Sequence, residues 1–105
     1  MKMYLYDNQT AKLIELGFEK PKSKVLFEVG NDELGYTYSI GELIEMLGVH
    51  SSKRIRYVAT KRAWIVDVDV LGKSGCAKCY RGVYHAELVD ALYDMIVKLK
   101  EEGVI

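Results

Sequence analysis

Two stretches of alternating apolar and polar residues, joined by four residues, constrain the fold of this chain more than any other feature. The alternation runs over residues 54–59 and again over residues 64–71, and a period of two is typical of a strand with one buried face. The apolar positions are Ile55, Tyr57, Ala59, Trp64, Val66, Val68 and Val70. The sequence therefore predicts an antiparallel hairpin over 54–71, whose loop of residues 60–63 places Ala59 opposite Trp64.

The polar faces of the two strands carry complementary charges. If both apolar sets share one side of the sheet, the same register places Arg56 opposite Asp67. It also places Arg54 opposite Asp69. Each such cross-strand pair contributes ~0.2 to 1 kcal/mol, so we expect the charges to reinforce the register that the apolar faces set.

Three amphipathic helices are predicted by their end signals, over about residues 8–16, 40–47 and 86–102. The N-terminus of the second helix has the clearest signal, because Ser39 and Glu42 have the spacing of a capping box. In a capping box each of the two side chains accepts a hydrogen bond from the other residue's backbone N–H. Each predicted helix is followed by glycine and then by an apolar residue, at Gly17-Phe18, Gly48-Val49 and Gly103-Val104. A glycine in the left-handed conformation ends a helix, and the apolar residue then folds back on the last turn.

Shorter extended segments complete an α+β fold with an antiparallel sheet centred on the 54–71 hairpin. Residues 24–29, 36–38 and about 79–83 are predicted as strands, and the C-terminal helix is expected to pack across one face of the sheet. The residues expected to be buried between that helix and the sheet are Leu92, Met95, Ile96, Leu99, Tyr57, Val66 and Val68. A chain of 105 residues with 50% apolar side chains sustains one core, so residues 1–105 are predicted to form a single domain.

Composition and charge exclude several classes of protein. The 15 Lys and Arg side chains balance 15 Asp and Glu side chains, which argues against a generally basic nucleic-acid-binding protein. No segment approaches the roughly 18 uncharged apolar residues of a membrane span, and residues 1–7 lack the long apolar stretch of a secretion signal. We therefore expect a cytoplasmic protein that does not engage a membrane.

The Cys76-Ala-Lys-Cys79 segment has the spacing of a pair of metal ligands. Together with His85 and His50, the two thiols would supply the four ligands of a tetrahedral zinc site, although the sequence lacks the paired histidines of a zinc finger. Redox chemistry is disfavoured. A reactive Cys pair of this spacing lies at the start of a helix, whereas a strand is predicted at this position. The favoured interpretation is two reduced cysteines in a strand and its loop, with no bound cofactor.

Five cations and no acid occupy residues 49–62. The five are Lys53, Arg54, Arg56, Lys61 and Arg62. Such a cluster can bind phosphates while an aromatic ring, here Tyr57 or Trp64, stacks on a base. The alternative is a solvated hairpin end, because the arginines of the predicted strand have Asp partners and both rings fall on its core side.

The other chemistry-bearing residues do not indicate catalysis. His85 and Glu87 supply a base and a carboxylate at the start of the last helix, and nothing in the sequence brings them to the strand that carries Asp67. Six of the eight tyrosines suit an amphipathic protein-binding surface as well as they suit half-buried strand positions, namely Tyr4, Tyr6, Tyr36, Tyr38, Tyr80 and Tyr84. We therefore predict a non-enzymatic interaction protein whose partner is another protein or a second copy, with nucleic-acid contact through the basic hairpin and a zinc-bound module as alternatives.

Most of the chain follows a characteristic order of elements, carried by Thr10–Phe18, Pro21, Tyr38–Leu47, the strand of Trp64 and Glu87–Leu92. In this order the chain resembles a group of small proteins carried by bacterial phages and prophages. That group has no assigned biochemical activity, so the resemblance implies an accessory protein of a mobile element and supplies no catalytic residues. The loop over residues 72–78 departs from the group's pattern, and any function of Cys76 in this loop and Cys79 after it would be particular to this chain.

Overall fold

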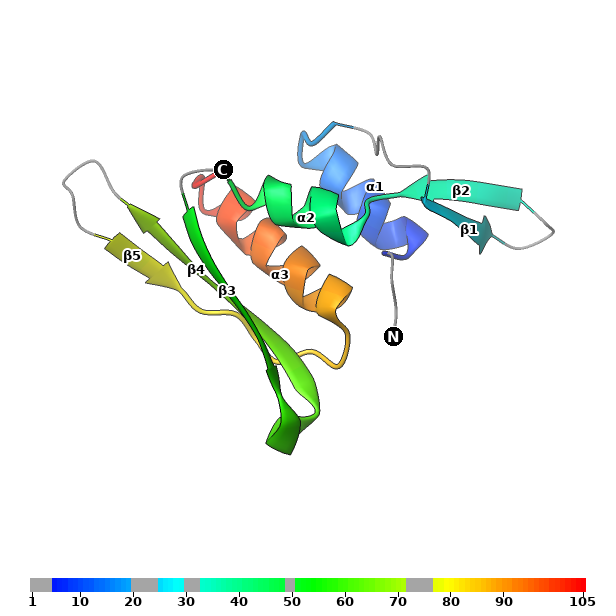
Figure 1. Cartoon of the computed structure of the whole chain (residues 1–105). Helices are drawn as coiled ribbons and strands as arrows, with labels where there is room; N and C mark the ends of the chain where they lie inside the picture. The colour runs from blue at the N-terminus through cyan, green and yellow to red at the C-terminus, as the bar shows by residue number, and fades with distance from the viewer. Residues whose placement is uncertain (1–4, 20–24, 30–32, 49–50, 72–76) are drawn as a thin grey trace.

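A computed structural model of the chain describes residues 5–19, 25–29, 33–48, 51–71 and 77–105 (Figure 1). The elements are, in chain order, α1 (Asp7–Glu15), β1 (Val25–Val29), β2 (Glu33–Thr37), α2 (Ile40–Met46), β3 (Ser51–Val58), a 3-10 turn (Ala59–Lys61), β4 (Ala63–Leu71), β5 (Ala77–Tyr80) and α3 (Leu88–Glu101). The predicted α+β class and its three helices are confirmed. None of the described helices is long and apolar enough to cross a membrane.

The elements form a sheet, a central helix and an outer layer of two shorter helices. Strands β3, β4 and β5 form an antiparallel sheet with β4 in the middle. Helix α3 lies across one face of this sheet, and α2 packs on α3 from the other side (Figure 1). Strands β1 and β2 pair with each other alone and form a separate antiparallel hairpin that projects from the helical side.

The ends of the helices follow the signals in the sequence. At the start of α2, the Ser39 hydroxyl accepts a hydrogen bond from the Glu42 N–H, and the Glu42 carboxylate accepts one from the Ser39 N–H, both at 3.1 Å. The glycines that end the helices all have positive φ, 102° at Gly17, 98° at Gly48 and 74° at Gly103. The returning hydrogen bonds join the Phe18 N–H to the Leu13 carbonyl at 3.1 Å and the Val104 N–H to the Leu99 carbonyl at 2.9 Å. The contact expected of Val49 lies outside the described residues.

The register of the β3–β4 hairpin differs from the predicted one by two residues. Tyr57, and not Ala59, lies opposite Trp64. The turn occupies residues 59–62, one position earlier than expected, and it ends at Arg62 in the left-handed conformation (φ 47°, ψ 45°). A shift of two residues keeps every side chain on its predicted face, because side chains alternate with a period of two.

Both predicted ion pairs form, although along diagonals of the hairpin. The Cα partner of Arg56 is Ile65, yet the Arg56 Nη2 atom lies 3.2 Å from the Asp67 Oδ2 atom. Likewise Arg54 lies opposite Asp67 and reaches Asp69, with 3.3 Å between Nη2 and Oδ1. A diagonal neighbour is within reach of a long side chain, so charge pairing is compatible with more than one register.

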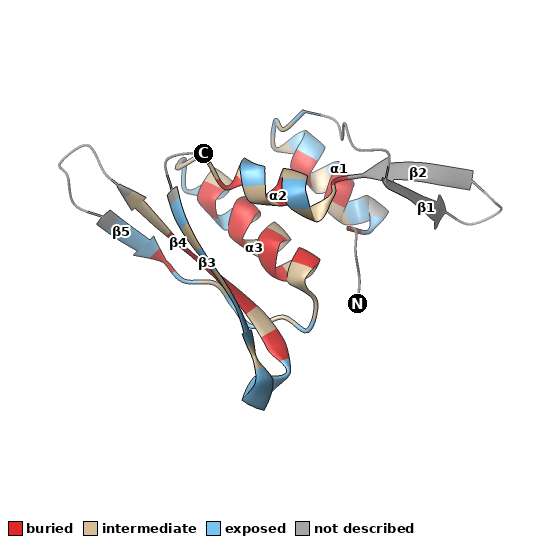
Figure 2. Ribbon diagram, viewed as in Figure 1, coloured by how far each residue is buried: buried red, intermediate tan, exposed pale blue. Residues whose placement is uncertain are grey.

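The core lies around α3, which packs against the inner face of the sheet on one side and against the buried residues of α1 and α2 on the other (Figure 2). The predicted core residues Val66, Val68, Leu92, Met95, Ile96 and Leu99 are all at most 1% exposed. The prediction for Tyr57 is wrong, because its side chain is 53% exposed. Tyr57 is on the inner face of its strand, but the end of the β3–β4 hairpin projects past the start of α3 and has no helix above it (Figure 1).

A bulge next to β4 fixes how the chain enters α3. Strand β5 follows β4 up to the pair Tyr80–Val68, and pairing resumes at the bridge between His85 and Trp64. Residues 81–84 therefore span the edge that only residues 65–67 occupy on β4. Within the bulge, the Gly82 N–H donates to the Asp67 Oδ1 atom at 3.0 Å.

Asp67 lies on the polar face of its strand, as predicted, but this contact helps to bury it. Asp67 is 5% exposed, and its carboxylate accepts hydrogen bonds from Arg56 and from the Gly82 N–H. A buried carboxylate is tolerated when hydrogen bonds replace its hydration. Asp67 therefore serves as an internal acceptor that holds both neighbouring segments against β4.

Substitution of Leu92 by alanine tests the placement of α3. Leu92 is fully buried, so Leu92→Ala should lower the free energy of unfolding by about 2–5 kcal/mol, measured by denaturant titration. Glu101→Ala, at an exposed position of the same helix, is the control and should change it by less than about 0.5 kcal/mol. Similar values for the two variants would place Leu92 outside the core.

The same substitution at two glycines tests the bulge. A Cβ at Gly82 would lie 2.2 Å from the Val66 carbonyl oxygen, which belongs to a strand and cannot move away. We expect Gly82→Ala to lower the free energy of unfolding by about 1–3 kcal/mol. Gly41→Ala is the matched control, because a Cβ there meets only the Ser39 Oγ atom at 3.8 Å and alanine favours a helix. A Gly82→Ala variant as stable as the parent would refute the close approach.

Candidate functional site

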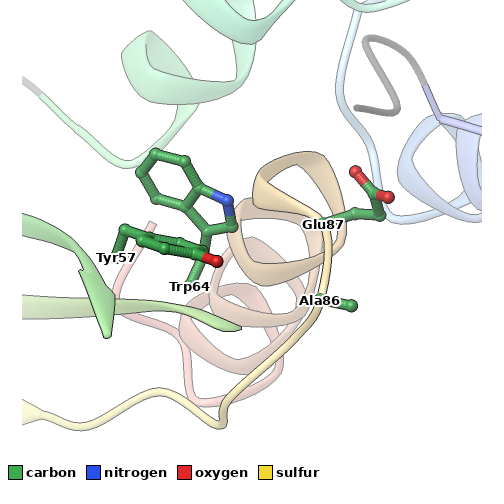
Figure 3. A pocket seen from close by; sticks show the side chains of 4 residues that line it. All are labelled: Tyr57, Trp64, Ala86 and Glu87. Carbon is green, nitrogen blue, oxygen red and sulfur yellow. The ribbon is translucent and has the colours of Figure 1, made fainter. Parts of the chain in front are cut away.

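An open hollow lies at the projecting end of the hairpin and is the best candidate for a binding site. It is lined by Tyr57, Trp64, Ala86 and Glu87 and has a volume of ≈ 390 Å³ (Figure 3). The Tyr57 and Trp64 rings form a tilted pair, with 5.2 Å between centroids and 57° between planes. This geometry is typical of stable aromatic pairs, so the two rings form a preformed apolar surface.

Backbone pairing next to β4 positions the hollow. The Trp64 N–H donates to the His85 carbonyl at 2.6 Å, and the His85 N–H donates to the Trp64 carbonyl at 2.9 Å. Ala86 and Glu87 follow directly and therefore lie beside the aromatic pair. The Glu87 carboxylate points away from the two rings (Figure 3), so the part of the hollow next to the rings is apolar.

Further apolar surface lies on the segment that leads from β5 to α3. Val83 is 61% exposed and Tyr84 is 42% exposed, and the Lys61 Nζ atom lies 4.7 Å from the centroid of the Tyr84 ring. The sequence identified Tyr84 as one of several candidate surface tyrosines and gave no signal for Val83 or Ala86. Their place at the hairpin end depends on the bulge, which no local pattern in the sequence marks.

The five cations proposed as a phosphate-binding cluster occupy different surfaces. Arg54 and Arg56 lie on the outer face of β3 with their ion-pair partners on β4. Lys53 alternates onto the inner face, where its Nζ donates to the Gly48 carbonyl at 2.7 Å. Lys61 and Arg62 are exposed in the turn. The hairpin therefore brings two of the five to its end and distributes the other three over two faces.

Of the four proposed zinc ligands, the structure describes Cys79 and His85, and these two residues have different neighbours. Cys79 is exposed on the outer face of β5, and its Sγ accepts a hydrogen bond from the Arg54 Nη2 atom at 3.2 Å. The His85 Nε2 atom lies 3.5 Å from the Asp94 Oδ2 atom, a distance at which a protonated imidazole forms an ion pair. Cys76 and His50 lie outside the described residues. Among the described residues, no three His, Cys, Asp or Glu side chains are grouped closely enough to hold a metal ion.

Among the described residues, two tyrosines have perturbed acidities, and neither lines the hollow. Burial raises the pKa of Tyr38, and the nearby Glu42 raises it further. Burial likewise raises the pKa of Tyr93, with additional contributions from Asp94 and Glu101. The Tyr38 hydroxyl donates to the Glu19 carbonyl. These shifts follow from packing within the fold and do not indicate a proton-transfer group at the hollow.

Comparisons of this chain with protein-family models, with curated proteins and with solved structures found no match. The interpretation of the hollow therefore depends on its own geometry.

Chelation tests the proposed zinc site directly. Zinc at Cys79 would lie beside the Arg54 guanidinium, whose charge repels the cation, and the described core is closed by apolar side chains. We expect protein purified under reducing conditions to contain no stoichiometric zinc, and EDTA to leave its melting temperature unchanged. One zinc per chain, or melting that depends on the chelator, would make the zinc-bound module the leading function.

Proposed function

We propose that this chain is a non-enzymatic interaction protein that binds a partner protein through the end of the β3–β4 hairpin. The observation that carries the proposal is the aromatic pair that lines an open hollow, in which Tyr57 is 53% exposed and the half-buried Trp64 supports its ring. Large amphipathic rings of this kind contribute most of the binding energy in many protein interfaces. They lose little conformational entropy on binding when they are already packed against each other.

The surroundings of the pair support a protein partner. Val83 and Tyr84 extend the exposed apolar surface around the same end of the molecule. Polar and charged groups, among them Lys61, Arg62 and Glu87, surround the apolar residues. An apolar centre with a polar rim is the usual anatomy of a protein interface.

Contact with nucleic acid is the second candidate function. Lys61 and Arg62 are exposed in the turn beyond Tyr57 and Trp64, and cations next to aromatic rings are typical of single-strand binding. This candidate predicts affinity for oligonucleotides that falls steeply as the salt concentration rises. The predicted setting, as an accessory protein of a phage or prophage, is part of the proposal under either partner.

Removal of one ring tests the proposed function. Partner proteins are first captured from cells of the natural source on the wild-type chain, and each is then purified and its affinity measured. We expect Tyr57→Ser to weaken the binding of the true partner by about 10-fold or more, that is about 1.4 kcal/mol, because a hot-spot ring is lost. The measurement is made by titration calorimetry.

The matched control makes the same substitution at a distant tyrosine. Tyr6 is 61% exposed at the N-cap of α1, and serine is favoured at an N-cap. Tyr6→Ser should therefore fold and bind as the wild type does. Partners that lose affinity equally in both variants, or in neither, would contradict a binding site at the hairpin end.

A further inference from the structure

The free edge of β3 is the longest unpartnered strand edge that the structure describes. In the described part of the chain, β3 pairs with β4 alone, over eight consecutive residue pairs from Ser51–Val70 to Val58–Ala63. None of the β3 residues whose side chains are described is buried, whereas the middle of β4 is buried. Outward-facing N–H and C=O groups of such a strand can pair with an added strand.

The charges on β3 determine which strand fits this edge. Lys53, Arg54 and Arg56 give the strand three cations, and residues 49–62 contain no acid. A second copy of the chain, paired antiparallel through the middle of β3, would bring these cations close to the same three in its partner. Like charges opposite one another destabilise a pair of strands, so self-pairing is disfavoured and an acidic strand is favoured.

We propose that the β3 edge binds an acidic, extended segment of a partner protein, which adds a strand antiparallel to β3. This inference rests on the proposed function and names the partner's chemistry. Arg54 and Arg56 project on the outer face, and Tyr57 lies on the inner face beside the hollow. The complementary segment therefore has an apolar residue opposite Tyr57, followed by acids opposite Arg56 and Arg54.

The two arginine side chains lean over β4, where Arg56 contacts Asp67 and Arg54 contacts Asp69, and both are partly exposed. Their side chains are 50% and 60% exposed for Arg54 and Arg56, respectively. Each guanidinium has five N–H donors, and the contacts of Arg56 to Asp67 and of Arg54 to Asp69 and Cys79 all use Nη2. Because both guanidinium groups lie on the β4 side, an added strand on the free side of β3 engages their remaining donors only when the exposed side chains turn towards it, in exchange for partly exposed ion pairs, which contribute little to stability.

A synthetic peptide tests the inference directly. The probe is acetyl-Thr-Phe-Glu-Val-Glu-Val-Thr-amide, whose Phe is designed to lie opposite Tyr57 and whose two Glu lie opposite Arg56 and Arg54. We expect saturable NMR shifts of the backbone amides of residues 51–58, and slower hydrogen exchange of the β3 amides that face the free edge. No saturable shift in residues 51–58 at millimolar peptide would overturn the proposal.

Two control peptides separate strand addition from general attraction. In the first, lysines replace both glutamates, and we expect no saturable binding. The second keeps the sequence and both charges but is N-methylated at the central Val and the following Glu. Because N–H groups of consecutive residues point to opposite sides of a strand, one of the two lost donors must face β3. Binding of either control as tightly as the probe would refute acidic strand addition.

Two variants of the protein locate the binding energy. Arg54→Gln removes a cation from β3 and should weaken peptide binding by about 5-fold. Arg62→Asn removes a cation from the turn, where asparagine tolerates the left-handed backbone, and should change binding by less than about 2-fold because exposed charges are screened. Equal losses in the two variants would show that attraction is spread over the hairpin, and would overturn the β3 site.

The remaining outcomes separate this inference from the proposed function. If residues 51–58 respond to the peptide but no partner depends on Tyr57, the edge site is supported and the proposed function fails. If a partner depends on Tyr57 but the peptide does not bind, the proposed function stands and the acidic strand is refuted. Protection of the β3 edge by self-association, or tighter binding of a thymidine oligonucleotide to residues 51–58, would also overturn the inference.

Discussion

The hydrogen bonds of the Asp67 carboxylate link β4 to the segments on its two edges, β3 and the bulge of residues 81–84. It is buried within the sheet and accepts hydrogen bonds from Arg56 on one side and from the Gly82 N–H on the other. A buried carboxylate without partners would be costly, and these two hydrogen bonds offset the loss of its hydration. One side chain thereby holds β3 and the bulge on opposite edges of the same strand.

The hydrogen bond from the Gly82 N–H to Asp67 helps to position the residues that line the hollow. The bulge at Gly82 returns the chain to β4 at the bridge between His85 and Trp64, and Ala86 and Glu87 then lie beside the aromatic pair. The same path fixes where α3 begins and which length of the hairpin it covers. Tyr57 remains exposed because it lies past that length, although it shares a face with the core residues of the sheet.

The helix ends could be predicted because they depend on local residues. The exact register of the β3–β4 hairpin could not be predicted. The capping box of Ser39 and the glycine stops depend on residues within one turn, so their geometry follows from the sequence. Alternation of apolar and polar residues shows which side chains share a face, but registers that differ by two residues satisfy it equally. The observed register therefore differs from the predicted one by two residues while every side chain stays on its predicted face. The register is set by the turn, which ends at Arg62 in the left-handed conformation. Arginine rarely adopts this conformation, so the sequence does not predict where the turn ends.

The candidate site was harder to predict for a related reason. The count of five cations in residues 49–62 is a property of the sequence, but a period of two distributes them over both faces of a strand. Exposure of Tyr57 and burial of Asp67 both depend on segments distant in sequence, the start of α3 and the bulge of residues 81–84. No pattern within the hairpin contains that information.

The cations of β3 have a dual consequence for association. An eight-residue strand edge that no other described strand covers invites pairing with identical chains, and positive charge on the edge opposes this. The same charge lowers the free energy of encounter with an acidic segment, and a neutral or basic segment gains nothing from it. In the proposed function, protection against self-association and preference for an acidic partner would be two results of the same three side chains. The aromatic pair would then have a separate role, because its apolar surface would add affinity that depends little on the sign of the partner's charge.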